Sequence, residues 1–201
     1  MMPYKPNERE YRNLTNFDIQ NERQDDLIIR GTPVIFDVPT VLCSIDGIDY
    51  QECIASGALD SCDMSDFIFN RNHGKGDATV YARTKNNSLA YQITQQGLNI
   101  EAHLDKEDER HIALHRDIQK GRIDKMSFSF VVQEDSYDRD THTRTILKIK
   151  KLYDVSAVDF PAYNDTSIQT ARDFFAEEHA KEFKELEQRH RRQMLILKTL
   201  I

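Results

Sequence analysis

The sequence lacks several features that define large classes of proteins. Its 201 residues include no tryptophan and only 3 cysteines. No uninterrupted apolar stretch approaches the roughly 18 residues of a transmembrane helix. The opening segment, MMPYKPNERE, has no apolar core of the kind that secretory signals carry. These absences exclude a membrane-spanning protein and favour a chain that stays in the cytoplasm where it is made, with no membrane partner.

The few cysteines predict neither a metal site nor a disulfide framework. Cys43, Cys53 and Cys62 are odd in number and form no CxxC pair. The first histidine, His73, follows all of them, so no zinc-like spacing arises. We therefore expect free thiols in a reducing compartment, with no metal and no cofactor.

Positive charge is also scarce. The chain has 27 Lys and Arg against 34 Asp and Glu, a net charge of −7. Its one dense basic cluster is Arg189, Arg191 and Arg192. Proteins that bind nucleic acid concentrate basic side chains on one face to neutralise phosphates. The charge balance therefore argues against nucleic acid as a partner.

Short strand-like segments make up the middle of the chain. Residues 1–25 are polar and predict a flexible N-terminal arm. Beyond them, brief β-branched and aromatic runs alternate with Gly, Pro and Asn turn signals. Two runs have a period of two, which is typical of antiparallel strands with one buried face: Leu89, Tyr91 and Ile93, then Leu98, Ile100, Ala102 and Leu104. The sum is a mostly β fold with helices (α+β), in which residues 26–166 form an antiparallel β-barrel of about seven or eight strands.

One segment inside this domain has helical character. Residues 107–120 follow Asp105, which can cap a helix, and precede Gly121, which can end one. Ile112, His115 and Ile118 give the segment an apolar stripe. We therefore expect one internal helix laid against the barrel.

Residues 167–201 predict a separate, long amphipathic helix. Its apolar and histidine side chains recur at steps of three and four: Phe175, His179, Phe183, Leu186, His190, Met194, Leu197 and Ile201. The stripe either packs on the chain's own barrel or pairs with a second subunit or a scaffold. Because the helix is longer than a domain of this size needs, we expect the half from Leu186 onward to be buried only against another chain.

Several side chains have the chemistry of a serine nucleophile and its partners. A serine hydroxyl needs a base within hydrogen-bond reach, and the base needs a group that fixes its tautomer. His73, in FNRNHGKG, is a candidate base at a strand-to-loop junction. Ser127 and Ser129 share the polar face of KMSFSFVV, and the pattern does not choose between them. Asp154 lies in an apolar strand and needs a partner if it is buried, either a lysine or an imidazole.

Taken in order, the segments resemble the caudovirus prohead protease family, the capsid-maturation serine proteases of tailed phages. The matching landmarks are GTPVIFD, ECIASGALD, FNRNHGKG, SLAYQITQQGLNIEAHL, QKGRIDKMSFSFVV and LYDVSAVDFPAYNDTSIQTAR. They cover about residues 27–172, and the most specific are KMSFSF and DVSAVDFPAYNDT.

The resemblance implies a serine endopeptidase whose barrel is related to herpesvirus assemblin. Carried over by motif, His73 is the base and Ser127, rather than Ser129, is the nucleophile. Asp154 takes the orienting role, with His103 as a poor second because assemblin-like enzymes use a second histidine. Ser129 stands where many relatives have Gly or Ala. The oxyanion hole is expected to be backbone amides near residues 166–172.

The resemblance also implies partners and a place of action. The expected substrates are the phage scaffold, or the scaffolding arm of the major capsid protein, and the enzyme itself, inside the assembling prohead in the host cytoplasm. Self-association through the terminal helix is a further expectation. The competing hypothesis is a noncatalytic capsid-assembly protein that keeps the barrel and acts through this helix.

Overall fold

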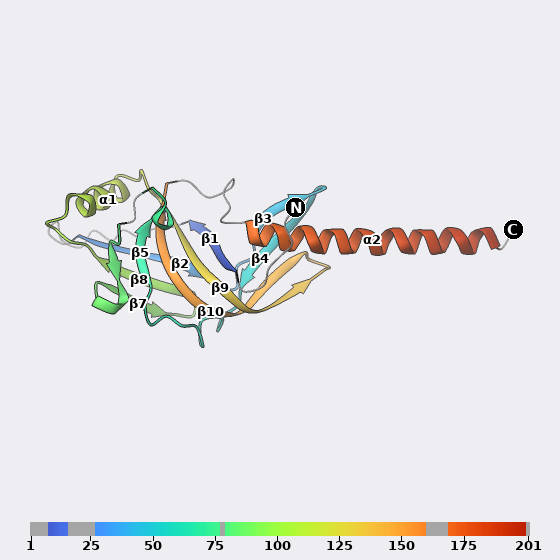
Figure 1. The fold of residues 1–201 in the computed structure, drawn as a ribbon, viewed down its shortest axis with the longest axis horizontal. Coiled ribbons are helices and arrows are strands. Elements are labelled where there is room, and N and C mark those ends of the chain that lie inside the picture. Colours follow the sequence, from blue (N-terminus) through green and yellow to red (C-terminus); the bar gives the residue numbers. More distant parts are fainter. Residues whose placement is uncertain (1–7, 16–26, 77–78, 160–168, 200–201) are drawn as a thin grey trace.

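The computed structural model describes residues 8–15, 27–76, 79–159 and 169–199 (Figure 1). These residues form a mixed α+β fold with two sheets and two α-helices. The strands are β1 (Arg9–Thr15), β2 (Ile28–Ile35), β3 (Thr40–Ile45), β4 (Ile48–Ile54), β5 (Ile68–Arg71), β6 (Ala82–Arg83), β7 (Leu89–Ile93), β8 (Gly97–His103), β9 (Lys125–Asp138) and β10 (Thr143–Val158). The α-helices are α1 (Glu109–Gln119) and α2 (Gln169–Thr199), and the 3₁₀ turns are η1 (Asn72–Gly74) and η2 (Thr84–Asn86).

The larger sheet is organised around β10, the longest strand. Its order is β1-β9-β10-β4-β3, and β5 with β6 joins it through β10. β10 pairs with β9 along its length, with β4 near its beginning and with β5 near its end. Both β4 and β5 run parallel to β10, so the expectation of a purely antiparallel sheet is wrong at these two pairings.

The smaller sheet has the order β2-β8-β7 and is antiparallel. Leu98, Ile100 and Ala102 on β8 are buried, as their alternation predicts. On β7, however, Tyr91 and Ile93 are exposed, because β7 is the edge strand and its end is not covered. The two sheets do not close into one barrel, and the barrel expected from the sequence is not confirmed.

One continuous hydrophobic core holds the two sheets and α1 together. Its largest members include Phe67, Phe69, Phe128 and Phe130, all inaccessible to solvent. The phenylalanines of β9 alternate with the two serines of the same strand, so one face of β9 builds the core and the other presents hydroxyl groups. A rigid, buried strand therefore positions both candidate nucleophiles.

Helix α1 begins later than its sequence signals indicate. Its N-cap is Asp108, whose carboxylate accepts the backbone N–H of Arg110 at 2.9 Å, and not Asp105. The buried face is His111, Leu114 and Ile118, so the stripe expected through Ile112 and His115 is wrong, except for Ile118. The end is as expected: Gly121 adopts a left-handed conformation (φ 66°) that suits glycine.

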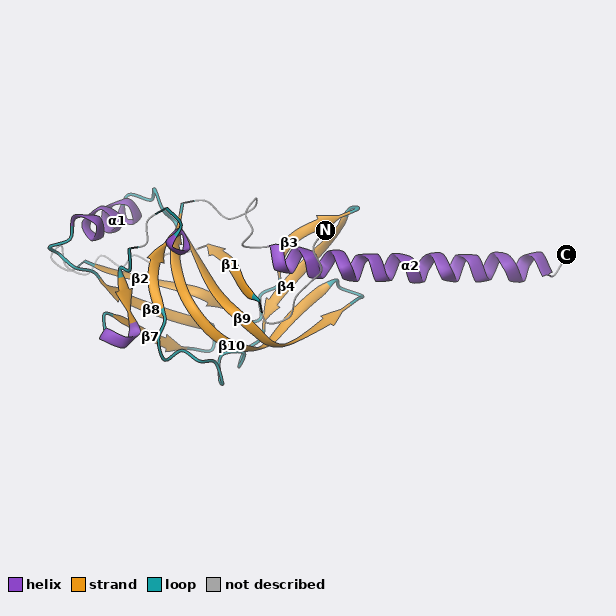
Figure 2. Cartoon of the chain, in the orientation of Figure 1, coloured by secondary structure: helices purple, strands orange, loops and turns teal. Residues whose placement is uncertain are grey.

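The first strand and the last helix contact the body of the protein in different ways. Residues 9–15, which fall within the expected flexible arm, form strand β1 against β9. Helix α2 starts on the body of the protein, where Phe175 packs on Tyr50, and then extends away from it (Figure 2). No helix among the described residues is long and apolar enough to cross a membrane.

Candidate active site

A bulge in β10 brings its acidic residue to the hydroxyl face of β9. The ladder pairs Leu152 with Phe130 and Asp154 with Ser129, so Tyr153 is one residue extra on β10. Strict alternation would put Leu152 and Asp154 on the same face. With the bulge, Leu152 and Val155 both enter the core, and Asp154 turns to the serines.

The parallel pairing of β5 with β10 delivers the histidine. Asp154 lies opposite Ile68, and the ladder continues to Ala157 opposite Arg71. The chain then turns directly into η1, which carries His73. The imidazole therefore lies over the end of β10, beside the hydroxyl face of β9.

The turn that holds His73 has an unusual backbone. Asn72 (φ 49°) and His73 (φ 57°) both have left-handed conformations, which cost energy for residues other than glycine. Asp159 stabilises this turn: its carboxylate accepts from the Asn72 amide at 2.9 Å and from Arg71 at 2.7 Å. Its own backbone N–H donates to Asn72 Oδ1 at 3.2 Å. The strain at His73 thus has local compensation, as is typical of functional turns.

The side chains of Ser127, His73 and Asp154 lie next to one another, with the histidine between the serine and the acid. His73 Nε2 lies 2.6 Å from Ser127 Oγ, and His73 Nδ1 lies 2.6 Å from Asp154 Oδ1. When Nδ1–H donates to the carboxylate, Nε2 is left with a lone pair that accepts the Ser127 hydroxyl proton. The geometry is therefore that of a nucleophile, a base and an orienting acid.

Further hydrogen bonds fix the histidine and the acid. Ser156 Oγ accepts the backbone N–H of His73 at 3.1 Å, donates to Asn70, and lies 3.1 Å from Asp154 Oδ1. Ser129 Oγ donates to Asp154 Oδ2 at 2.5 Å. Both oxygens of the carboxylate are therefore engaged.

The acid is ionised despite its burial. Asp154 is 1% exposed, and this burial alone would raise its pKa. The hydrogen bond and charge of His73, the Ser129 hydroxyl and the charge of Arg9 outweigh it and lower the pKa below its ordinary value. A carboxylate in this state can stabilise the imidazolium that forms when His73 takes a proton.

Two contributors could not be found from sequence patterns, and a third has a role other than the one expected. Tyr11, on β1, packs edge-on against His73, with ring centroids 4.7 Å apart. Arg9 forms an ion pair with Asp154 and donates to Ser129 Oγ at 2.7 Å. Both lie in the segment expected to be a flexible arm. Ser129, which the sequence offers as an alternative nucleophile, instead binds the acid.

The other expected site residues lie elsewhere. His103 is on β8 in the smaller sheet, where its Nε2 lies 2.8 Å from Glu101 Oε1. Residues 166–168 of the expected oxyanion segment lie outside the described residues, and the rest of that segment begins α2. In the described ranges, no group of three or more His, Cys, Asp or Glu residues could hold a metal ion.

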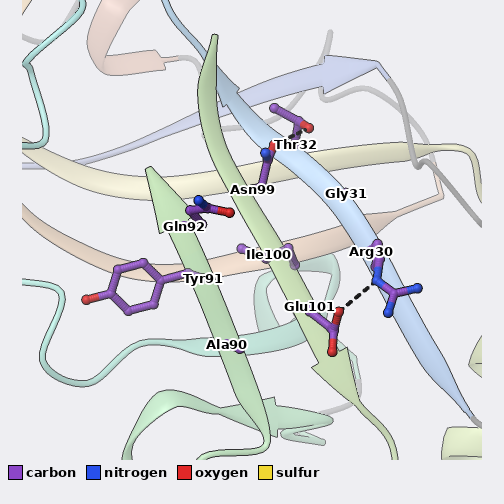
Figure 3. A pocket seen from close by; sticks show the side chains of 9 residues that line it. All are labelled: Arg30, Gly31, Thr32, Ala90, Tyr91, Gln92, Asn99, Ile100 and Glu101. Carbon is purple, nitrogen blue, oxygen red and sulfur yellow. Dashed lines mark hydrogen bonds and ion pairs between the residues drawn. The ribbon is translucent and has the colours of Figure 1, made fainter. Parts of the chain in front are cut away.

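A surface hollow on the smaller sheet is separate from this site. Tyr91, Asn99 and the ion pair of Arg30 with Glu101, 2.7 Å apart, are among its lining residues (Figure 3). It contains neither the serine nor the histidine of the triad-like cluster. The candidate catalytic residues therefore lie outside this hollow, on the larger sheet and the η1 turn that follows β5.

An aligned serine, histidine and buried aspartate on a β-sheet scaffold define the class of serine hydrolases. Comparison with protein families narrows this class. The model of the caudovirus prohead serine proteases matches residues 15–182, and the chain belongs to this family. It is a serine endopeptidase of the kind that acts in capsid maturation. No curated protein and no solved structure matched the chain.

Proposed function

We propose that Ser127, His73 and Asp154 are the catalytic residues of a prohead endopeptidase. The observation that carries this proposal is the pair of 2.6 Å contacts from the two ring nitrogens of His73 to Ser127 Oγ and to Asp154 Oδ1. Ser129, the other candidate nucleophile, has its hydroxyl bound to Asp154 and Arg9. Ser127 is the serine within reach of the base.

In the proposed reaction, Ser127 Oγ bonds to the scissile carbonyl carbon while its proton moves to His73 Nε2. The imidazolium then gives this proton to the leaving amine as the C–N bond breaks, which leaves an acyl-enzyme. Water loses a proton to Nε2 as it attacks the ester, and the proton returns to Ser127 Oγ as the carboxylic product leaves. Backbone amides supply the oxyanion hole.

The proposed substrates are the scaffold, or the scaffolding arm of the major capsid protein, and the enzyme itself. This proposal rests on the family and places the reaction inside the assembling prohead, in the host cytoplasm. A location inside the prohead suits this proposed cleavage, because a protease confined with its substrate acts at high effective concentration.

The test is co-expression with the capsid precursor of the same phage. Ser127→Ala should leave the precursor uncleaved while shells still assemble. Ser136→Ala is the matched control, because Ser136 lies on the same strand but is exposed. This variant should still process the precursor. Normal processing by Ser127→Ala would overturn the assignment of the nucleophile.

A second candidate function is that of a noncatalytic assembly protein acting through α2. The observation in its favour is the exposure of Phe183, Leu186 and Met194 on this helix. The aligned cluster around His73 favours the enzyme, because a scaffold needs no strained histidine or buried carboxylate. Labelling by a fluorophosphonate distinguishes them, since a noncatalytic protein would not react at Ser127.

The exposed half of α2 also supports self-association, as a part of the proposed enzyme. The β9–β10 hairpin braces the helix as far as Glu185, which lies 2.9 Å from Arg139. Around this point the stripe is almost symmetric about Gln188, with Phe183 and Leu186 before it and His190 and Met194 after it. A two-fold axis at Gln188 would pair this stripe with its own copy in an antiparallel helix pair.

The occupant we propose for the distal half of α2 is a second copy of this chain, because the spacing of the stripe on either side of Gln188 is nearly self-complementary.

A further inference from the structure

Strand β1 belongs to the catalytic sheet although it precedes the residues that the family model matches. The match begins at residue 15, whereas β1 pairs with β9 from Arg9 opposite Val131 to Thr15 opposite Lys125. Family membership therefore assigns no role to this strand.

One face of β1 is anchored in a buried charge cluster. The Arg12 guanidinium donates to Glu52 Oε2 at 2.6 Å, and the Glu10 carboxylate accepts from both terminal nitrogens of Arg144, at 3.0 and 3.1 Å. All four side chains are at most 5% exposed. Burial raises the pKa of Glu10, but the two arginines outweigh it and lower this pKa overall. The cluster fixes β1 in register against the sheet.

The opposite face of β1 directs Arg9 at the catalytic acid. The Arg9 guanidinium lies over the Tyr153 ring, 4.5 Å from its centroid, and 5.4 Å from the centroid of Tyr11. From there it donates to Ser129 Oγ through Nη2 at 2.7 Å and through Nε at 3.1 Å, and forms an ion pair with Asp154 Oδ2. Two aromatic rings thus hold the plane of a half-exposed arginine against a buried carboxylate.

We propose that Arg9 and Ser129 are positioning residues that fix the Asp154 carboxylate for catalysis. The proposal rests on the proposed function of the same site. A carboxylate can rotate about its last side-chain bond and exchange its two oxygens. Here one oxygen faces His73 and Ser156, while Ser129 and Arg9 hold the other. With Oδ2 held, Oδ1 stays aligned with His73 Nδ1, which keeps the base in its productive tautomer.

Arg9 also has an electrostatic effect opposite in sign to its positioning effect. Its positive charge offsets part of the Asp154 charge, so it weakens the pull of the carboxylate on the imidazolium. Removing Arg9 should therefore slow the reaction, through a misaligned carboxylate, and also make the base lose its proton at higher pH. Loss of β1 packing alone would not move the pH profile in this way.

The charged and titratable groups around Asp154 are few. β1 contributes Arg9 and Tyr11, η1 contributes His73, and β10 contributes Tyr153. From β9, Ser129 binds Asp154 directly and Ser127 contacts His73, and from β5, Asn70 contacts Ser156; all three side chains are neutral. The ion pair of Arg71 with Asp159 is internally compensated. Among the described residues, Arg9 is the arginine that forms an ion pair with Asp154, so its removal changes the field at the acid.

The test measures the second-order rate of fluorophosphonate labelling of Ser127 in the full chain, from pH 5 to 9. For Arg9→Ala we expect the plateau rate to fall about 10- to 100-fold, as misplaced catalytic groups cause. We also expect the pH of half-maximal rate to rise by about half a unit or more. Arg9→Lys keeps the charge, so its half-maximal pH should equal the wild-type value. Its plateau labelling rate should lie between those of Arg9→Ala and wild type. Ser129→Ala should slow labelling and leave the half-maximal pH closer to wild type.

Arg30→Ala is the matched control, because Arg30 pairs with Glu101 on the smaller sheet, and it should label like wild type. A plateau rate for Arg9→Ala within twofold of wild type would overturn the proposal. So would a slower rate with an unchanged pH profile, which would show a merely structural role. If Arg9→Ala does not fold, the test uses Arg9→Lys and Ser129→Ala instead. Labelling of both variants at the wild-type rate would overturn the proposal. If wild-type Ser127 is not labelled at all, the proposed function itself fails.

Discussion

Asp154 lies opposite Ser129 in the β9–β10 ladder, because β10 carries one extra residue immediately before the aspartate. This bulge changes which face of β10 meets the core. Above it, alternation buries Leu152 in the core; below it, alternation buries Val155 and Ala157 in the core and leaves Asp154 and Ser156 on the face of the proposed active site. One inserted residue therefore allows a single strand to serve both the core and the proposed catalytic cluster.

The bulge can be tested by adding the residue that β9 lacks opposite Tyr153. An alanine inserted between Ser129 and Phe130 gives Tyr153 a partner and restores plain alternation, which would put Leu152 and Asp154 on one face of β10. Asp154 should then turn away from His73 or the ladder should slip by one residue, and we expect fluorophosphonate labelling of Ser127 to fall at least 100-fold. Tyr153→Phe keeps both the bulge and the ring under Arg9, and should retain labelling within about threefold. Full labelling of the insertion variant would contradict the role of the bulge.

The lowered pKa of Asp154 makes stability depend on pH in a defined direction. Because the carboxyl binds its proton less readily in the folded protein than in the unfolded chain, its ionised form stabilises the fold at pH values above the unfolded value of about 3.9. This contribution is lost as the pH falls through the lowered pKa. The free energy of unfolding of Asp154→Asn should therefore lie below that of wild type at pH 6, with a difference that shrinks as the pH falls below about 4.

Urea unfolding at a series of pH values measures this difference. Asp49→Asn serves as a control, because Asp49 is an exposed carboxylate on the same sheet. A difference between wild type and Asp154→Asn that stays constant from pH 6 to pH 3 would contradict the ionised state of the acid.

The buried charge cluster behind β1 predicts a large loss of stability on truncation. Arg144 is inaccessible to solvent and binds Glu10, Glu52 and Asp135. Arg144→Ala leaves the buried carboxylates of Glu10 and Glu52 to share the single cation Arg12, and should lower the free energy of unfolding by about 3–5 kcal/mol. Arg122→Ala removes a largely exposed arginine paired with Asp117, and should change it by less than about 1 kcal/mol. Equal effects in denaturant unfolding would show that the cluster contributes no more than a surface ion pair.

The distal half of α2 predicts the mass of the protein in solution. Truncation after Gln188 removes half of the symmetric stripe and the arginines beyond it, while Arg139 and Glu185 still brace the remaining helix. By light scattering, the full chain should have the mass of a dimer and the truncated chain that of a monomer. If both have the same mass and both are packaged into proheads, the helix is only a local brace.

The sequence predicts the strand-rich body, the two α-helices and the three candidate catalytic residues, because each depends on local periodicity or on a specific motif. It does not predict strand β1, since polar residues such as Glu10 and Arg12 join the sheet through buried ion pairs rather than through an apolar pattern. It also does not predict the parallel pairing of β5, which depends on contacts far apart in the chain. It also does not predict where α1 starts, because Asp105 and Asp108 are both competent caps.

The most direct test of the account is to map the residue that a fluorophosphonate modifies. Wild-type protein is labelled, digested and analysed by mass spectrometry, with His73→Ala and Asp154→Asn treated in parallel. The account predicts a single adduct on Ser127 in the wild type, and a labelling rate at least 1,000-fold lower in each variant, since loss of either partner disables the base. An adduct on Ser129, or equal labelling of wild type and His73→Ala, would contradict it.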